Sequence, residues 1–417
     1  MALLSLVLLL IAVILGFTRK MNTGLLAIAL AVLLSRVAGI KDADIIRGFN
    51  TSLFVMLLGV SYLFSLCQLN GTLDLLAKKV VALAGKRSFL VPILVYVFTV
   101  VMAAIGPGTV PTVAIMTVFA MPMAVRMGIS PVLMASLIVV GGAGGGLSPL
   151  ATTGIIGLNL AAKFGLTGIE MPYLFDGIFT ATVYCTIMYF VLGGYKVHAE
   201  ASAELADLPA FNGKQKVTLL AIAVLVFMVM VLRINVGLSS FAIAAVLSLL
   251  KISDEKEALK RVPWGTLLLI TGVGILMHQI SALGGIKMLS NALLAIINEK
   301  TAVSIVGLCS GVLSWFSSTS GVVMPTFIPT IPHIVARLGE QNVNPVEMLT
   351  AISMIASTAG ISPLSTGGAL SMAAYSSTVS SDPRKQNALF MKLFACSAGS
   401  VLLVSILAYF GLYSWIL

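Results

Sequence analysis

The sequence is poor in charge and in the residues that catalysis or metal binding requires. Only 10% of its 417 residues are charged, against about a quarter in an ordinary soluble protein. Its 3 His, 4 Cys and 15 acidic residues form no H-E-x-x-H motif and none of the cysteine spacings typical of a metal site. An intramembrane enzyme is therefore not expected, and the cysteines are interpreted as reduced packing residues.

Acidic side chains are also missing from the middle of the apolar stretches. All 15 acidic residues are expected in loops or at helix ends, and His278 and His333 lie near the ends of apolar stretches. A proton relay across a membrane normally needs an ionisable group within it. We therefore expect neither a proton relay through the protein nor a carboxylate site for a cationic substrate.

Long apolar runs dominate what is present. Hydrophobic residues make up 59% of the chain, and runs of about 20 residues, long enough to span a bilayer as a helix, recur throughout. The first run, residues 2–17, lacks the basic segment and the cleavage site of a signal peptide. The net charge of +10 comes from Lys and Arg scattered through short loops, which is typical of membrane proteins. The sequence predicts an all-α polytopic membrane protein that binds no nucleic acid.

The chain matches itself at a shift of 214 residues. The segment LSPLATTG (147–154) meets ISPLSTGG (361–368) at this shift. Identical residues also meet in the pairs Pro111 and Pro325, Pro131 and Pro345, Pro149 and Pro363, Thr152 and Thr366, Arg19 and Arg233, and Arg47 and Arg261. Matches around similar polar breaks at one common shift favour a duplicated fold.

Each half is expected to contain about five transmembrane helices, one re-entrant hairpin and one interrupted helix. The predicted units are a first repeat (1–194, with hairpin 88–125 and interrupted helix 130–163), a cytoplasmic linker (195–216) and a second repeat (217–417, with hairpin 302–336 and interrupted helix 345–378). The other expected helices are 2–17, 23–40, 52–69, 71–85, 172–194, 217–232, 237–250, 264–281, 285–298 and 387–410. An odd number of crossings per half places the halves in opposite orientations, the inverted-repeat architecture of secondary transporters.

The distribution of Lys and Arg predicts the orientation. When the loops are assigned to alternate sides, seventeen of the 25 Lys and Arg residues fall on the side that holds the linker. The positive-inside rule makes that side cytoplasmic. We expect a multi-pass protein of the inner (plasma) membrane with both termini outside, a first hairpin that enters from the cytoplasm and a second that enters from outside.

Four breaks interrupt the apolar stretches, at residues 106–112, 141–149, 317–322 and 357–363. Non-helical backbone at membrane depth is stable only inside protein or beside a water-filled cavity. A half-helix that begins after a break presents free N–H groups suited to an anion, and unwound carbonyls suit Na⁺. The alternatives are close helix packing at the glycines and hydroxyls that bond back to the preceding turn.

The Ser-Pro pairs, each with a Thr three residues after the proline, recur in both halves and favour a binding site at the breaks. The predicted substrate ligands are Thr109, Ser148, Pro149, Thr152, Ser318, Thr319, Ser362, Pro363 and Thr366. The predicted Na⁺ ligands are the carbonyls or hydroxyls of Gly106, Gly108, Gly144, Ser317, Ser318 and Gly360. We expect Ser148, Thr152, Ser362 and Thr366 to converge near the middle of the membrane.

Na⁺ is the expected coupling ion because of a charge argument. No Arg falls at the four breaks, and two helix N-termini supply only about one positive charge between them. A bound dianion would keep about one uncompensated negative charge, which costs several kcal/mol when buried. One or more bound Na⁺ ions would remove this cost.

Two parts of the chain carry a resemblance to a known family. Residues 105–156 begin with IGPGTVPT and end with GGAGGGLSPLATTGII, and the second half contains SSTSGVVMPTFIPTIPHI and ISPLSTGGALSMAA. These segments resemble the MatC-type dicarboxylate carriers of the ion transporter superfamily, relatives of the divalent anion:sodium symporters (DASS). The likeness is strongest over 100–160 and 310–380.

The resemblance implies a homodimer in which each protomer has a scaffold and a mobile transport domain, with elevator-like alternating access. In the sodium symporters each hairpin tip carries Ser-Asn-Thr. The tips here read Gly106-Pro107-Gly108-Thr109 and Ser317-Ser318-Thr319-Ser320, so both lack the Asn. Only Thr109 and the hydroxyl residues of the second tip are carried over by position.

The predicted function is secondary active symport of Na⁺ and a small organic anion, a C3/C4 dicarboxylate such as malonate, malate or succinate, without an organic cofactor. Several alternatives remain open: a citrate or sulfonate carrier, an arsenite-type efflux permease, an H⁺-coupled permease or exchanger, and the membrane subunit of a TRAP-type system. The TRAP subunit would need a soluble binding protein.

Overall fold

The structure is a computed structural model that describes every residue except 84–86, 198–207, 340, 381, 412 and 414–417. The described residues form helices joined by turns, with no strand among them. Nine helical segments in this part of the chain are long and apolar enough to cross a membrane. The chain is therefore a multi-pass membrane protein, which confirms the predicted class. Residues 198–207 of the predicted linker (195–216) lie outside the described residues.

The first half contains ten α-helices. They are α1 (Ala2–Arg19), α2 (Thr23–Ala38), α3 (Asp42–Ile46), α4 (Thr51–Leu69), α5 (Thr72–Ala82), α6 (Leu90–Ala104), α7 (Thr109–Arg126), α8 (Pro131–Gly145), α9 (Thr152–Ala162) and α10 (Glu170–Val191). The expected hairpin corresponds to α6 and α7, and the expected interrupted helix corresponds to α8 and α9. A 3-10 turn, η1 (Gly194–Lys196), follows α10.

The second half repeats this order. Its elements are α11 (Gly213–Met230), α12 (Val236–Leu249), α13 (Glu255–Arg261), α14 (Trp264–Ala282), α15 (Gly285–Leu294), α16 (Ala302–Ser314), η3 (Thr319–Val323), α17 (Met324–Phe327), η4 (Ile328–Thr330), α18 (Ile331–Leu338), α19 (Pro345–Thr358), η5 (Ala359–Ile361), α20 (Thr366–Thr378) and α21 (Pro383–Tyr409). The second hairpin therefore runs from α16 to α18, and the second interrupted helix consists of α19, η5 and α20.

Helix bounds recur at the 214-residue spacing. The first residue of α9, Thr152, lies 214 positions before the first residue of α20, Thr366. Packing recurs as well, because α2 lies on α14 as α12 lies on α4, and α6 lies on α8 as α16 lies on α19. The short helices α3 and α13 also correspond in position, although neither was expected from the sequence.

The glycine-rich break in the first half is shorter than expected. Helix α8 continues through Gly145, and the unwound segment is residues 146–151. A Cβ atom on Gly144 would lie 2.6 Å from Ala181 Cβ, and one on Gly145 would lie 2.1 Å from the Val100 carbonyl oxygen. These glycines let α8 pack against α10 and α6, so here the packing interpretation of the glycines is correct.

The two hairpins differ in their second arm. Helix α7 is continuous through Pro122, whereas the corresponding arm consists of the π-helical turn η3, α17, the 3-10 turn η4 and α18. Pro325, Pro329 and Pro332 lie in this arm, and each removes a backbone donor. The proline spacing therefore accounts for the segmented arm.

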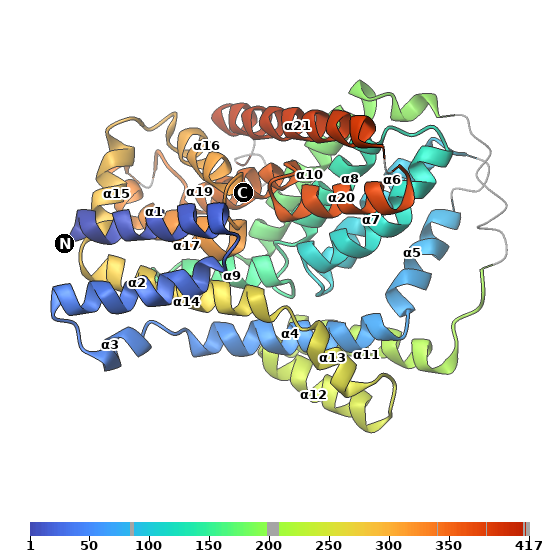
Figure 1. Cartoon of the computed structure of the whole chain (residues 1–417), viewed down its shortest axis with the longest axis horizontal. Coiled ribbons are helices and arrows are strands. Elements are labelled where there is room, and N and C mark those ends of the chain that lie inside the picture. Colours follow the sequence, from blue (N-terminus) through green and yellow to red (C-terminus); the bar gives the residue numbers. More distant parts are fainter. Residues whose placement is uncertain (84–86, 198–207, 340, 381, 412, 414–417) are drawn as a thin grey trace.

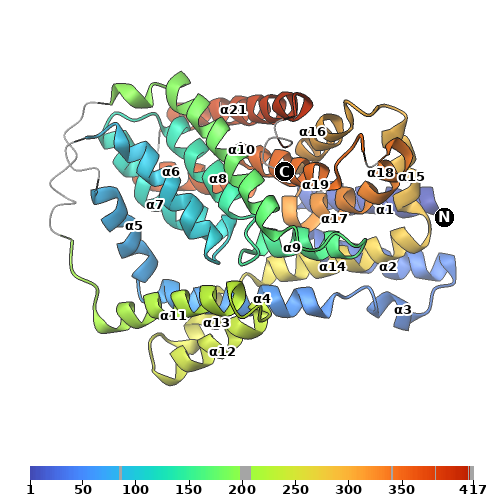
Figure 2. The ribbon, with the colours of Figure 1, turned by 180° about the vertical axis from the view of Figure 1, so that it is seen from behind.

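One half of each interrupted helix, α9 in the first and α19 in the second, lies at the centre of the molecule (Figures 1 and 2). Helices α4 and α14 run along one side, with α2 and α12 packed on them, while α6 to α8, α10, α20 and α21 gather on the other side (Figures 1 and 2). Nearly every residue of α8 is buried, and so is most of α19. The first unwound segment, residues 146–151, is enclosed by protein, which is the condition for broken backbone in a membrane, whereas Leu364 in the second is exposed.

One expectation about charge is wrong. Asp176 is the seventh residue of α10 and has no exposed surface, although all acidic residues were expected in loops or at helix ends. Helix α10 begins at Glu170, before the expected start at residue 172. This earlier start and the packing of α10 on α19 place Asp176 inside the protein.

Candidate functional site

A cavity of about 300 Å³, here called the central cavity, brings the two halves of the chain together. Its lining includes Thr152 and Thr366, the first residues of α9 and α20. Pro107 of the first hairpin tip and Ser320 of the second also line it, and α4 and α14 form its other walls. The volume is at the lower end of the range for small-molecule sites.

The Ser-Pro pairs shape the turns that lead to this cavity. Ser148 Oγ accepts a hydrogen bond from the Leu150 N–H at 3.2 Å, and Ser362 Oγ accepts the equivalent bond from the Leu364 N–H at 3.2 Å. Both serines are buried and neither lines the central cavity. The intervening prolines, Pro149 and Pro363, have no N–H to donate. Neither Ser-Pro pair is among the residues that line the cavity, and each serine holds the turn that precedes the next half-helix.

The half-helices α9 and α20 begin at the cavity without a side-chain cap. Neither helix has a side-chain hydrogen bond at its N-terminus, whereas α2, α12 and α19 are capped by asparagine side chains. The first N–H groups of a helix have no partner within the helix, and they carry partial positive charge. At α9 the Gly154 N–H donates to the Gly146 carbonyl at 2.8 Å and is not available to a ligand. The remaining first N–H groups of the two ends are suited to an anion.

The first hairpin tip is fixed against the interrupted helix. Thr109 Oγ1 donates a hydrogen bond to the Gly142 carbonyl at 3.0 Å. Gly108 has a φ of +76°, a conformation that favours glycine, and a Cβ atom there would lie 2.7 Å from Thr152 Oγ1. Gly106 lies against the ring of Phe64. This tip therefore approaches the start of α9 closely because it has no side chain at residue 108.

The second tip makes an equivalent contact with a different local structure. Thr319 Oγ1 donates to the Ala356 carbonyl at 3.1 Å, and Ala356 lies 214 positions after Gly142. Ser318 Oγ accepts from the Gly321 N–H at 3.1 Å, and Ser317 Oγ donates to the Leu313 carbonyl at 2.8 Å. The hydroxyls of all three residues are therefore engaged with the protein. Only the neighbouring Ser320 lines the central cavity.

The predicted Na⁺ ligands are distributed around the two tips. Gly106 and Gly108 belong to the first tip, Ser317 and Ser318 to the second, and Gly360 lies in η5. Gly144 is within α8, where the side that would carry a Cβ faces α10. Within the described part of the chain, no group of three or more His, Cys, Asp and Glu side chains could hold a metal ion. A bound Na⁺ would therefore be coordinated by carbonyl and hydroxyl oxygens.

One buried hydroxyl near the first tip has no partner. Thr112 lies one turn into α7 and has no exposed surface, and its Oγ1 makes no hydrogen bond to any described residue. Its counterpart in the second half, Thr326, donates to the Val322 carbonyl at 2.7 Å. The free Thr112 oxygen fits the class of ligand that a Na⁺ ion needs beside the first tip.

Sequence reasoning missed an arginine at the central cavity. Arg261, the last residue of α13, is the only charged residue among those described as lining the cavity. Burial raises the pKa of the Asp74 carboxyl, while the nearby Lys78 and Arg261 lower it, so Asp74 offsets part of the Arg261 charge. The match of Arg47 with Arg261 at the 214-residue shift was the sequence signal that could have pointed to Arg261. It was interpreted only as support for the repeat.

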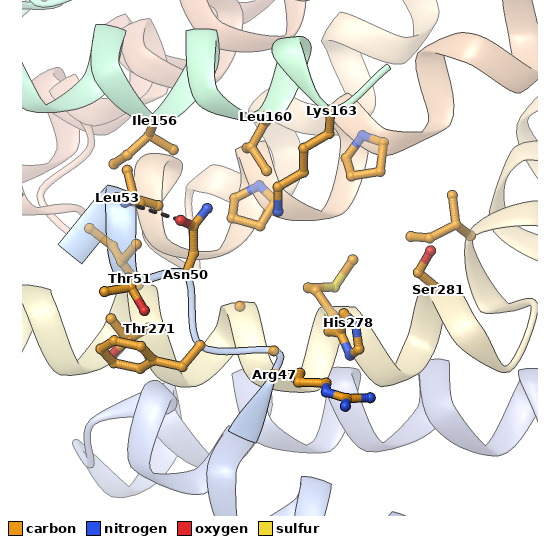
Figure 3. Close-up of a pocket in the computed structure, with 18 of the residues that line it drawn as sticks. Arg47, Asn50, Thr51, Leu53, Ile156, Leu160, Lys163, Thr271, His278 and Ser281 are labelled. Carbon is orange, nitrogen blue, oxygen red and sulfur yellow. Dashed lines mark hydrogen bonds between the residues drawn. The ribbon is translucent and has the colours of Figure 1, made fainter. Parts of the chain in front are cut away.

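Two larger cavities adjoin the central one. The first, of about 590 Å³, is lined by Arg47, Lys163 and His278. Figure 3 shows Lys163 extending from α9 into this space, with His278 on the opposite wall formed by α14. Ile156 and Ile270 line both this cavity and the central cavity. They form an apolar boundary between the two.

The second neighbouring cavity, of about 660 Å³, has Lys78, Arg126 and Asp74 in its lining. It shares Gln68 and Ile115 with the central cavity. The three cavities thus form a series through the protein with the central cavity in the middle. Basic residues outnumber acidic ones in each of them, which favours small anions over cations.

Comparison with known proteins agrees with an anion carrier. No curated protein gives a significant match to this chain. Residues 1–146, which include the first hairpin and all of α8, match the family model of the dicarboxylate carrier protein MatC N-terminus. The N-terminal third of the chain is therefore similar to a dicarboxylate carrier.

Proposed function

We propose that this protein is a secondary active transporter that carries a small dicarboxylate across the membrane together with Na⁺. The observation that carries the proposal is the meeting of two uncapped helix N-termini, both hairpin tips and Arg261 at one central cavity. The similarity of residues 1–146 to a dicarboxylate carrier supports this class of substrate.

In this proposal the substrate bridges the two half-helices. One carboxylate accepts hydrogen bonds from the Thr152 hydroxyl and the first N–H groups of α9, and the other uses Thr366 and α20. A C3/C4 chain separates its two carboxylates by only a few bonds, in keeping with a cavity of about 300 Å³. Arg261 provides long-range attraction that Asp74 partly offsets.

Na⁺ supplies the remaining positive charge. The two N-termini contribute roughly one unit of charge, and Arg261 is exposed at the edge of the site, where solvent weakens its field. Carbonyls of the tips and of the unwound segments, with the free Thr112 hydroxyl, are the proposed Na⁺ ligands. Binding of Na⁺ beside the first tip would also fix the contact of Gly108 with Thr152.

The transport mechanism follows from the recurring packing. The 214-residue recurrence of helix bounds and contacts supports two inverted repeats. We propose that the hairpins and interrupted helices move together as a transport domain against a scaffold that contains α4 and α14, in an elevator-like cycle within a homodimer. The cavity with Arg47 and Lys163 would then face outside, and the cavity with Lys78 and Arg126 would face the cytoplasm.

Uptake into proteoliposomes tests the proposal. Purified protein should accumulate radiolabelled succinate or malonate when an inward Na⁺ gradient is imposed, and it should fail to do so when choline replaces Na⁺. Competition by unlabelled citrate, sulfonates and arsenite separates the alternative substrates. Accumulation by the purified chain alone would also exclude an obligatory soluble binding protein. If no dicarboxylate is transported under a gradient of either Na⁺ or protons, the proposed function is wrong.

A further inference from the structure

A second polar cluster lies inside the protein, apart from the central cavity. Asp176 is completely buried in α10, about 9 Å along the helix from its first residue at 1.5 Å per residue. Thr350 of α19 donates to Asp176 Oδ2 over a long 3.4 Å, and Asp176 Oδ1 has no partner among the described residues. This carboxyl is therefore poorly satisfied as an anion.

The groups around Asp176 do not neutralise it. Glu347, one turn before Thr350 on α19, acts on Asp176 as a like charge. Tyr413 has no exposed surface, its hydroxyl faces Thr180 of α10, and it lies within electrostatic reach of both carboxyls. An unpaired buried carboxylate costs several kcal/mol, and a second carboxylate beside it increases this cost.

The other elements packed on α10 bring no cation to this cluster. Tyr96 of α6 contacts Thr182, and Cys396 of α21 contacts Tyr184, so these titratable groups meet α10 at least six residues further along it. Lys196 of η1 lies beyond the end of α10. Among the described residues, Glu347 and Tyr413 are thus the titratable groups that face Asp176.

We propose that Asp176, with Glu347 and Tyr413, forms a proton-binding site that is separate from the substrate cavity. A proton on Asp176 Oδ1 makes the acid neutral and lets it donate a hydrogen bond to a neighbouring oxygen. A metal ion would neutralise the carboxylate only if several oxygens coordinated it at short range. Glu347 is half-buried near the start of α19 and connects the cluster with water. The site deepens the proposed function, on which its role in transport rests, because it gives the carrier a means of responding to pH.

Proton binding can be measured without any substrate. If the folded protein holds a proton on Asp176 that the unfolded chain releases, unfolding releases a proton and stability falls as pH rises. The unfolding constant should then increase as pH rises above the ordinary pKa of an aspartic acid, by up to about tenfold per pH unit from this group alone. Thermal unfolding of the purified full chain in detergent, in potassium and in sodium buffers, gives this slope.

Substitutions test whether the pH dependence of stability comes from Asp176 and Glu347. Asp176→Asn keeps the shape of the neutral acid, and it should lose this part of the pH dependence. Glu170→Gln, which removes an acid from the first residue of the same helix, should keep it. Should the Asn variant not fold, Glu347→Gln provides an independent test: without the neighbouring charge, Asp176 ionises more readily and the slope should level off at a lower pH.

Two outcomes would overturn the proton site. One is a wild-type slope that both Asp176→Asn and Glu347→Gln retain unchanged. The other is a stability that depends on Na⁺ concentration at fixed pH, with a dependence that Asp176→Asn alters. That result would make the cluster a cation site. In proteoliposomes, Asp176→Asn should abolish the response of uptake to an imposed pH gradient. Failure of dicarboxylate uptake by the wild type would refute the proposed function and leave the unfolding result standing.

Discussion

Replacing the two cavity threonines with valine tests the proposed binding site most directly. Thr152 and Thr366 are the first residues of α9 and α20, and both line the central cavity. Valine has nearly the same shape as threonine, so the change removes a hydroxyl and leaves the packing almost intact. If each hydroxyl donates to a substrate carboxylate, each substitution removes one charge-assisted hydrogen bond.

The expected magnitude follows from the strength of such bonds. A hydrogen bond to a charged group contributes about 1.5–3 kcal/mol, which corresponds to about a 10- to 150-fold weaker affinity per substitution. Because the two residues occupy corresponding positions in the two halves, Thr152→Val and Thr366→Val should weaken binding to a similar degree. Isothermal titration of succinate or malonate into purified protein in sodium buffer measures this affinity.

A third threonine provides the matched control. Thr117 is buried in α7, donates to the Val113 carbonyl at 2.7 Å and does not line the central cavity. Thr117→Val should bind the dicarboxylate like the wild type. Folded Thr152→Val and Thr366→Val variants with wild-type affinity would refute the placement of the substrate between α9 and α20.

Three further predictions follow from the same geometry. Gly108→Ala should cost about 1–3 kcal/mol of stability, because its φ of +76° and ψ of −174° are accessible mainly to glycine. It should also reduce uptake, because the new Cβ would lie 2.7 Å from Thr152 Oγ1. Gly128→Ala, with a φ of +70° and open space around it, should show backbone strain alone, so equal uptake in both variants would contradict the role of the tip. Arg261→Gln should raise the KM for a dicarboxylate most strongly at low ionic strength, where charges are least screened. The control Arg19→Gln should leave the KM unchanged. A KM of the wild type that does not depend on salt would contradict long-range attraction of the substrate by Arg261. A reporter inserted near Ala203 should give a cytoplasmic signal and one fused after Leu417 an outside signal, although both positions lie outside the described residues; reversed signals would invert the proposed orientation.

The sequence by itself determined most of the helices and the 214-residue recurrence of their bounds. Spanning helices need about 20 apolar residues in a row, and proline and glycine disfavour continuous helix, so both signals are local, although α7 continues through Pro122 and α8 through Gly145. The expected helix at 264–281 and the observed α14 (Trp264–Ala282) differ by one residue. The short polar helices α3 and α13 were missed because five to seven residues carry little periodicity.

Only the tertiary structure decided which polar groups share a site. The Ser-Pro pairs were predicted as ligands; Ser148 and Ser362 hold local turns and do not line the central cavity, whereas Thr152 and Thr366 line it. Arg261 is distant in sequence from every break but lines the central cavity, and Asp176 is buried by the contact of α10 with α19. A sequence pattern reports the local backbone, whereas proximity depends on how helices from the two halves pack together. Whether a side chain binds a ligand, holds a turn or becomes a buried acid is therefore set by neighbours that can lie more than 100 residues away.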